Sequence, residues 1–266
     1  MTYPAEEPSA LPSLLGPGDP PPVELWNSAG SSPALLIADH AGSAIPARLG
    51  SLGLPPAARA LHIAHDIGIA DLTRALADRL DAAALLGRYS RLVIDGNRRL
   101  DDPTSIAQES DSVVVPGNRG LAAADRRARA EAVFAPYHAA IAAGLAERGR
   151  TGRRTALVSM HSFTPRMGGV ARPWHLGVLW DKDGRMAQPL LAALRAEPDL
   201  VIGENEPYDA RTGEGYTLDA HATPIGLPHV LIEVRQDLID ERGKAAALAE
   251  RLARILEPIV EETARG

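Results

Sequence analysis

The sequence has no cysteine, which excludes disulfide bonds, a thiolate nucleophile and cysteine-held zinc or iron–sulfur sites. A metal ion in this protein would have to be held by carboxylates and by some of the eight histidines. Lysine is almost absent, with only Lys182 and Lys244, and 28 basic residues face 34 acidic ones. The resulting net charge of -6 argues against a nucleic-acid partner, because phosphate binding requires a basic face.

Long apolar runs are also missing. No stretch approaches the ~20 residues that a membrane span requires, and the first residues lack the basic start and apolar run of a secretory signal. We therefore expect a cytoplasmic protein without a membrane partner. Residues 1–22 are rich in proline, which is typical of a flexible arm. Residues 23–266 contain no internal repeat or linker and are predicted to form one domain, whose oligomeric state the sequence does not indicate.

Short apolar runs alternate with longer amphipathic stretches along this domain. The apolar runs predict strands at Ala34–Ala38, Arg91–Asp95, Ala156–Met160, Leu176–Leu179, Leu200–Ile202 and Val230–Val234. Helical spacing predicts helices at Ile69–Leu80, Ala122–Arg148 with a break or kink near Pro136, Met186–Ala196 and Lys244–Ala264. Nearly unbroken apolar strands separated by helices indicate an α/β fold with a mostly parallel sheet covered on both faces.

Several polar residues stand at the ends of the predicted strands, where open α/β sheets bind their ligands. They are Asp39-His40, Asp95 to Arg98, His161-Ser162, Glu204 to Glu206 and, within the last strand, Glu233. A hydrolytic metal ion needs three protein ligands, one open position and a nearby carboxylate for proton transfer. His40, His161 and Asp66 as ligands, with Glu233 as the base, would meet that requirement.

The same residues also have structural interpretations. Asp66 precedes a predicted helix and is placed to be its N-cap. Glu233 lies two residues from Arg235 on one strand face, a spacing that suits an ion pair. Strand-end histidines are more often hydrogen-bonded residues than metal ligands, so the residues alone leave both interpretations open. No nucleophile elbow, Walker loop, dinucleotide fingerprint or His-Glu-x-x-His motif occurs.

Six short segments nevertheless occur in an order that resembles a known family. They are residues 39–46 (Asp-His-Ala-Gly and Ile-Pro), 65–68 (His-Asp-Ile-Gly), 89–98, 161–165, 205–208 (Asn-Glu-Pro-Tyr) and 232–237. Together they resemble the N-formylglutamate amidohydrolase family, in particular its branch with Asp-His-Ala in the first segment, from about Leu35 to Asp237. That family is related to the zinc carboxypeptidases and the aspartoacylase-like deacylases. The resemblance therefore implies a carboxypeptidase-like (phosphorylase/hydrolase-like) mixed sheet flanked by helices.

The resemblance also implies roles for individual residues. His40 and His161 match the zinc histidines, and Glu233 matches the catalytic glutamate. In the carboxypeptidase relatives the third ligand is a glutamate three residues after the first histidine; Ser43 stands there, so Asp66 is expected to replace it. The remaining matches are predicted to contact substrate: Asn97 and Arg98, the pair that grips a carboxylate, then Arg91, His221 and Arg235. For Arg91 a salt bridge with Asp95 is the alternative.

The function that the resemblance implies is hydrolysis, dependent on one Zn²⁺ ion, of the N-acyl amide of a small carboxylate-bearing substrate. The foremost substrate is N-formyl-L-glutamate, cleaved to formate and glutamate. Two alternatives remain: a related zinc deacylase or carboxypeptidase acting on another N-acyl amino acid or peptide, and a metal-free protein that binds a small ligand on the same scaffold.

Overall fold

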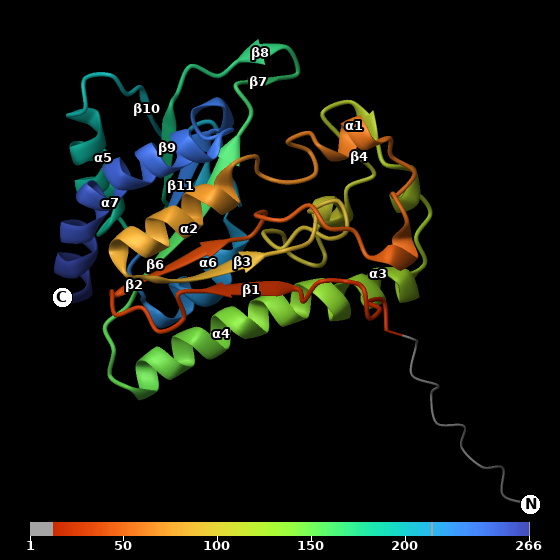
Figure 1. The fold of residues 1–266 in the computed structure, drawn as a ribbon, viewed down its shortest axis with the longest axis horizontal. Coiled ribbons are helices and arrows are strands. Elements are labelled where there is room, and N and C mark those ends of the chain that lie inside the picture. The colour runs from red at the N-terminus through yellow and green to blue at the C-terminus, as the bar shows by residue number, and fades with distance from the viewer. Residues whose placement is uncertain (1–12, 214, 266) are drawn as a thin grey trace, which may run out of the picture.

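The computed structural model describes residues 13–213 and 215–265, which form a single α/β domain around a seven-stranded mixed sheet (Figure 1). The strands of this sheet are β1 (Val23–Trp26), β2 (Ala34–Ala38), β3 (Ala83–Gly87), β6 (Ala156–Phe163), β9 (Leu176–Leu179), β10 (Ile202–Glu204) and β11 (His229–Arg235). Their order is β1-β3-β2-β6-β11-β9-β10. The four central strands β3, β2, β6 and β11 are parallel, while β1 and β9 run antiparallel to β3 and β11. The carboxyl ends of the four central strands therefore meet at one edge of the sheet.

Helices cover both faces of the sheet, as predicted. They are α1 (Pro56–Arg59), α2 (Ile69–Leu80), α3 (Ala123–Arg129), α4 (Ala135–Arg150), α5 (Ala187–Arg195), α6 (Tyr216–His221) and α7 (Arg242–Arg265). Leu36 of β2 belongs to the apolar core shared with α2, α5 and α7, whereas its neighbours Leu35 and Ile37 belong to the core shared with α4 and α6. This alternation is the two-residue period of a strand buried on both faces. Figure 1 shows α2 and α7 together, with α4 on the far side of β1.

A third apolar cluster lies in the loops beyond the sheet, and it explains one wrong prediction. Residues 91–93 form a turn and residues 94–95 have no regular structure, so no strand forms here, and Leu92, Val93 and Ile94 are buried in this cluster. Hydrogen bonds close the turn, among them one from the Leu92 N–H to Ser90 Oγ at 3.2 Å. A short apolar run has no periodicity that distinguishes a buried turn from a buried strand. The strand that enters the sheet is β3, a few residues earlier.

The long predicted helix is also divided. A π-helical segment, Ala130–Phe134, separates α3 from α4, so the predicted break near Pro136 is confirmed. The predicted strand at Leu200–Ile202 lies two residues further along, as β10. Two short hairpins flank the sheet: β4 (Glu109–Ser110) with β5 (Val113–Val114), and β7 (Arg166–Met167) with β8 (Val170–Ala171).

Residues 1–12 of the predicted arm lie outside the described residues. The described part, residues 13–22, runs against the domain: the carbonyl of Pro20 accepts a hydrogen bond from Tyr89 Oη at 2.7 Å, and that of Pro22 accepts one from the Arg88 N–H at 3.0 Å. None of the helices in the described ranges is both long and apolar enough to cross a membrane.

Candidate active site

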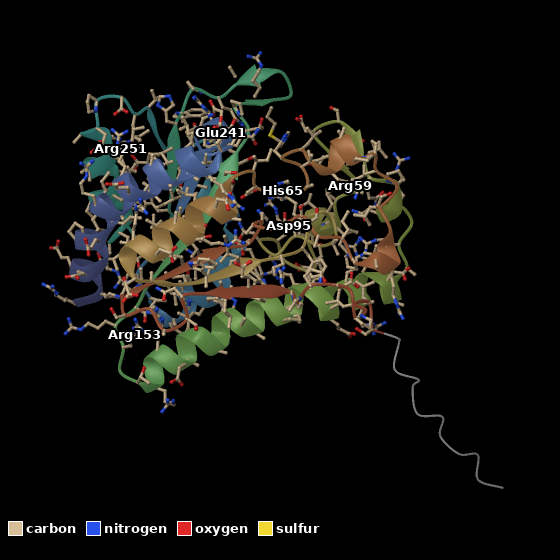
Figure 2. All side chains as sticks on the ribbon, in the orientation of Figure 1. Arg59, His65, Asp95, Arg153, Glu241 and Arg251 are labelled. Atoms are coloured by element: carbon tan, nitrogen blue, oxygen red, sulfur yellow. The ribbon has the colours of Figure 1, made fainter. Side chains whose placement is uncertain are left out.

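A cavity of about 340 Å³ opens at the carboxyl ends of the parallel strands. Its lining includes His40 just after β2, Asp66 just before α2, His161 in β6 and Glu233 in β11. All four side chains are buried. The volume lies within the range of small-molecule sites, so the cavity suits a ligand of amino-acid size. Figure 2 shows Asp95, another lining residue, among the loops between the sheet and α1, far from peripheral charges such as Arg153 and Arg251.

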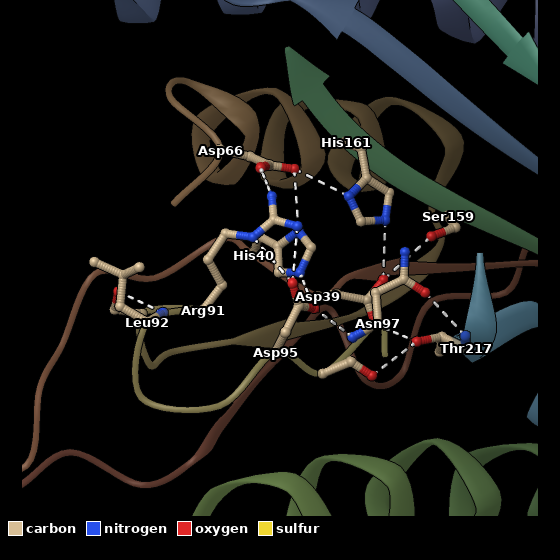
Figure 3. A network of polar contacts seen from close by, with 12 residues as sticks. Asp39, His40, Asp66, Arg91, Leu92, Asp95, Asn97, Ser159, His161 and Thr217 are labelled. Atoms are coloured by element: carbon tan, nitrogen blue, oxygen red, sulfur yellow. Dashed lines mark hydrogen bonds and ion pairs between the residues drawn. The ribbon is translucent and has the colours of Figure 1, made fainter. Parts of the chain in front are cut away.

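Two histidines and one aspartate converge in this cavity (Figure 3). One ring nitrogen of His40, one of His161 and a carboxylate oxygen of Asp66 all lie within 4.8 Å of one another. The Oδ2 atom of Asp66 is 3.0 Å from His161 Nδ1 and 3.6 Å from His40 Nδ1. The structure thus brings together the three residues that sequence analysis predicted as metal ligands.

The opposite nitrogen of each imidazole contacts a second buried carboxylate. His40 Nε2 lies 2.6 Å from Asp95 Oδ1, and His161 Nε2 lies 3.0 Å from Asp39 Oδ2. Because a carboxylate can only accept, these contacts favour a proton on Nε2 and direct the Nδ1 lone pairs toward Asp66. A metal-ligating histidine typically has such a carboxylate on its other nitrogen.

This donor set fits a divalent cation. The Nδ1 atom of His40 is buried without a hydrogen-bond partner, and lone pairs that face the Asp66 carboxylate repel unless a proton or a metal ion lies between them. Two imidazole nitrogens and one carboxylate oxygen are ligands that suit zinc, and the cavity leaves a further position open to a ligand.

The buried carboxylates and histidines of this cluster shift one another's pKa values toward the charged forms. Burial and Arg91 lower the pKa of His40, but Asp95 and Asp66 outweigh them, so the pKa is raised. Burial likewise lowers the pKa of His161, yet hydrogen bonds to Asp39 and Asp66 hold it well above its usual value. Burial raises the pKa of Asp66, but the two histidines outweigh it and the net shift is downward. The site therefore favours ionised carboxylates and, on the two imidazoles, a positive charge or a cation in its place.

Backbone contacts place Asp66. Its N–H donates to the His40 carbonyl at 2.9 Å, and its Oδ2 accepts from the Ser162 N–H at 3.1 Å. The N-cap of α2 is Gly68, without a side-chain cap, so Asp66 is not the helix cap of the alternative interpretation. Gly68 has a φ of +78°, and a Cβ there would lie 2.1 Å from the Ile239 carbonyl oxygen. Only glycine therefore suits the turn that joins Asp66 to α2.

Glu233 is aligned with His161 in the pairing of β11 with β6. It does not form the alternative ion pair with Arg235, which instead binds Asp237 at 2.7 Å. Glu233 Oε2 is buried without a hydrogen-bond partner, and burial raises the pKa of Glu233 to about 7. A carboxyl group with such a pKa both takes and releases protons near neutrality.

Of the residues predicted to bind substrate, some line the cavity and others do not. Asn97, Arg98 and Arg91 line the cavity. Arg91 also forms the salt bridge proposed as its alternative, with its Nη2 2.8 Å from Asp95 Oδ2. His221 and Arg235 are not among the lining residues. His221 Nε2 lies 2.8 Å from His138 Nδ1, in a pair of stacked rings behind Gly96, and Arg235 lies near the Pro173 carbonyl.

Sequence reasoning missed the carboxylates behind the histidines. Asp39 and Asp95 stand out as polar residues in the motif segments, but nothing in the spacing pairs Asp95 with His40, 55 residues away. Thr217 is also part of the network, because its Oγ1 donates to Asp39 Oδ1 at 2.6 Å and its N–H donates to Asn97 Oδ1. It carries no sequence signal, since 178 residues separate it from Asp39.

Comparisons with known proteins agree with this geometry. An α/β sheet with a buried His-Asp-His cluster at its carboxyl edge suits a hydrolase, and residues 32–240 match one particular family of hydrolases that act on amides. The chain belongs to the N-formylglutamate amidohydrolase family.

Two solved structures share the fold. The gene product Atu2144 from Agrobacterium tumefaciens is 34% identical, with a TM-score of 0.91 over 94% of this chain and 98% of its own. The N-formylglutamate amidohydrolase from Ralstonia eutropha is 21% identical, with a TM-score of 0.70 over 92% of this chain and 99% of its own. No protein of curated function matches the chain.

Proposed function

We propose that the protein uses one divalent metal ion, zinc, to hydrolyse the N-acyl amide of a small carboxylate-bearing substrate. The preferred substrate is N-formyl-L-glutamate, and the products are formate and L-glutamate. The observation that carries the proposal is the convergence of His40, Asp66 and His161, with carboxylates behind both imidazoles and Glu233 beside them. Membership of the amidohydrolase family supports the same reaction.

His40 Nδ1, His161 Nδ1 and one oxygen of Asp66 would hold the ion. When bound there, a divalent cation supplies Lewis acidity toward the amide carbonyl and lowers the pKa of water. Asp39 and Asp95 keep the imidazoles oriented through their Nε2 atoms. The protein's own share of the metal chemistry is therefore a fixed donor set in a buried cavity.

Glu233 moves the proton. Its carboxylate accepts a proton from the attacking water, whose oxygen forms a bond to the formyl carbon. The C–N bond then breaks, and Glu233 gives the proton to the leaving amine. A pKa of about 7 suits both transfers, because the group is then close to balanced between its two forms at neutral pH.

Arg98 and Asn97 orient the substrate from the cavity wall. A guanidinium group binds a carboxylate through two parallel hydrogen bonds, which fixes both position and direction. Holding the amide against the reacting groups in this way lowers the entropic cost of the reaction.

The test combines metal analysis with kinetics. Protein purified without added zinc should contain one divalent ion per chain and should hydrolyse N-formyl-L-glutamate faster than N-acetyl or N-succinyl amino acids. Glu233→Gln should retain the metal but lose about 10²–10⁴-fold in kcat. Glu204→Gln, a change in an exposed glutamate at the end of β10 and outside the cavity lining, is the control and should behave as wild type. Full activity of Glu233→Gln, or active protein without metal, would contradict the proposal.

A further inference from the structure

Tyr208 lies on the cavity wall in the segment 205–208, for which sequence reasoning assigned no role. The loop after β10 can approach the site because the residue of β9 that it passes is a glycine, which has no side chain to block it. Gly177 is aligned with Glu233 across the sheet, and a Cβ on Gly177 would lie 2.0 Å from the Glu206 carbonyl oxygen. The close approach of this backbone places Tyr208 within electrostatic range of Glu233.

Arg172 fixes the hydrogen-bonding role of the Tyr208 phenol. Its Nη1 donates to Tyr208 Oη at 3.2 Å, and its guanidinium carbon lies 4.9 Å from the centre of the tyrosine ring. A guanidinium can only donate, so the phenol oxygen accepts and its own proton stays available for another acceptor. Burial and Glu233 raise the pKa of Tyr208, which keeps that proton on the phenol at neutral pH.

Among the residues that the structure describes, no carboxylate lies within ion-pair distance of the Arg172 guanidinium. Its Nη2 donates to Met167 Sδ at 2.9 Å and its Nη1 donates to Tyr208 Oη, so both hydrogen-bond acceptors of the guanidinium are neutral. Arg91, on the same cavity wall, differs in this respect, because its Nη2 forms an ion pair with Asp95. The Tyr208 phenol can therefore donate a hydrogen bond to an anion at the cavity wall, and the positive charge of Arg172 behind it strengthens that bond.

We propose that Tyr208 binds the side-chain carboxylate of the substrate, and that Arg172 is a positioning residue that orients the phenol and adds positive charge. This inference rests on the proposed function, in which Arg98 holds the other carboxylate. Arg98 and Tyr208 come from different segments of the cavity wall. With one binding group for each of the two substrate carboxylates, the site selects N-acyl amino acids with an acidic side chain over those with a neutral one.

Binding of products tests the inference without requiring turnover. We expect the zinc-loaded full chain to bind L-glutamate more tightly than L-glutamine in isothermal titration calorimetry. Tyr208→Phe should weaken glutamate binding about tenfold, the value of a hydrogen bond to a charged group, and leave glutamine binding unchanged. Tyr216→Phe removes a phenol outside the cavity lining and is the matched control. Equal affinity of wild type for the two ligands, or an equal loss for both in Tyr208→Phe, would overturn the inference.

Kinetics separate this role from stabilisation of the reacting carbonyl. Tyr208→Phe should raise KM for N-formylglutamate about tenfold, with little change in kcat and no change for N-formylglutamine. A fall in kcat of equal size on both substrates would place Tyr208 at the reacting atoms and refute the binding role. Wild type that prefers glutamate over glutamine but hydrolyses no N-acyl amino acid would reject the proposed function and leave this inference standing.

Arg172→Met should reproduce the loss seen in Tyr208→Phe, while Arg172→Lys should recover part of it. Because the arginine acts largely through the phenol, the double variant Arg172→Met/Tyr208→Phe should lose much less than the sum of the single losses. Fully additive losses would show that the two side chains act independently and would remove the positioning role of Arg172.

Discussion

Two pairs of histidines lie in this molecule with nearly equal ring separations and opposite surroundings. The rings of His40 and His161 are 5.0 Å apart at an interplanar angle of 68°, and each has a carboxylate on its Nε2. The rings of His138 and His221 are 5.1 Å apart and stacked at 17°, joined to each other by a hydrogen bond. The acceptor for the outer nitrogen of His138 is the Gly96 carbonyl, not a carboxylate.

The difference shows that the partners of a histidine pair, not its spacing, decide its chemistry. Neighbouring carboxylates outweigh burial at His40 and His161 and raise their pKa values. At the other pair burial dominates: it lowers the pKa of His138 and, with help from His138, lowers the pKa of His221 to about 4. The first pair therefore suits a cation, and the second is a neutral structural pair.

The sharpest way to break this comparison is to remove one histidine of each pair. His40→Ala or His161→Ala should lose most of the bound zinc and reduce turnover below detection, because only one imidazole and Asp66 would remain. His138→Ala should keep one zinc ion per chain, since His138 does not line the cavity. Elemental analysis after gel filtration measures both. Zinc bound normally by His161→Ala would place the metal elsewhere.

The carboxylates provide a smaller effect. Asp39→Asn and Asp95→Asn remove the negative charge behind an imidazole but keep its size, and each should weaken zinc affinity about 10–100-fold in competition with a chromogenic chelator. Asp219→Asn, near the second pair in α6, is the control and should not change the affinity. If the control weakened zinc binding as much, the specific role of Asp39 and Asp95 would be lost.

Local pattern predicted most of the fold, because helices such as α2 bury a regular apolar stripe and β2 is a continuous apolar run, although β3 was missed. It failed at residues 91–95, where the apolar run fills a cluster of loops. For the site, strand-end position indicated His40 and His161, and the family resemblance supported them together with Asp66, the acidic residue before α2; the fold brings all three together. The contact of Asp95 with His40 and that of Thr217 with Asp39 depend on tertiary structure, and no local pattern records contacts between residues that distant.

Metal removal should affect stability differently in the variants of the two pairs. Zinc at 1,000 times its Kd stabilises the folded state by about 4 kcal/mol, and for a domain of this size each kcal/mol corresponds to about 2–4 °C in Tm. We expect a chelator to lower the Tm of wild type and of His138→Ala by about 10 °C in differential scanning calorimetry. His161→Ala should show almost no change, because it binds little zinc; a full shift there would contradict the site.

The smallest effect belongs to the second pair and concerns acid. His221 faces His138 and lies within electrostatic range of Asp39, and its folded-state pKa of about 4 is below its ordinary value of 6.5. Between these two pKa values the unfolded chain binds more protons than the folded one, so His221 makes the folded state less stable as pH decreases from 6.5 toward 4.

The measurement uses chelator-treated protein, so that release of zinc at low pH does not contribute. The Tm of His221→Gln should fall less between pH 7 and pH 5 than the Tm of wild type. The difference should be a few degrees at most, because His221 is only half-buried and water screens its charge. Parallel Tm curves would show that the folded state accommodates a charge at this pair, and the contrast with His40 and His161 would then rest on metal binding alone.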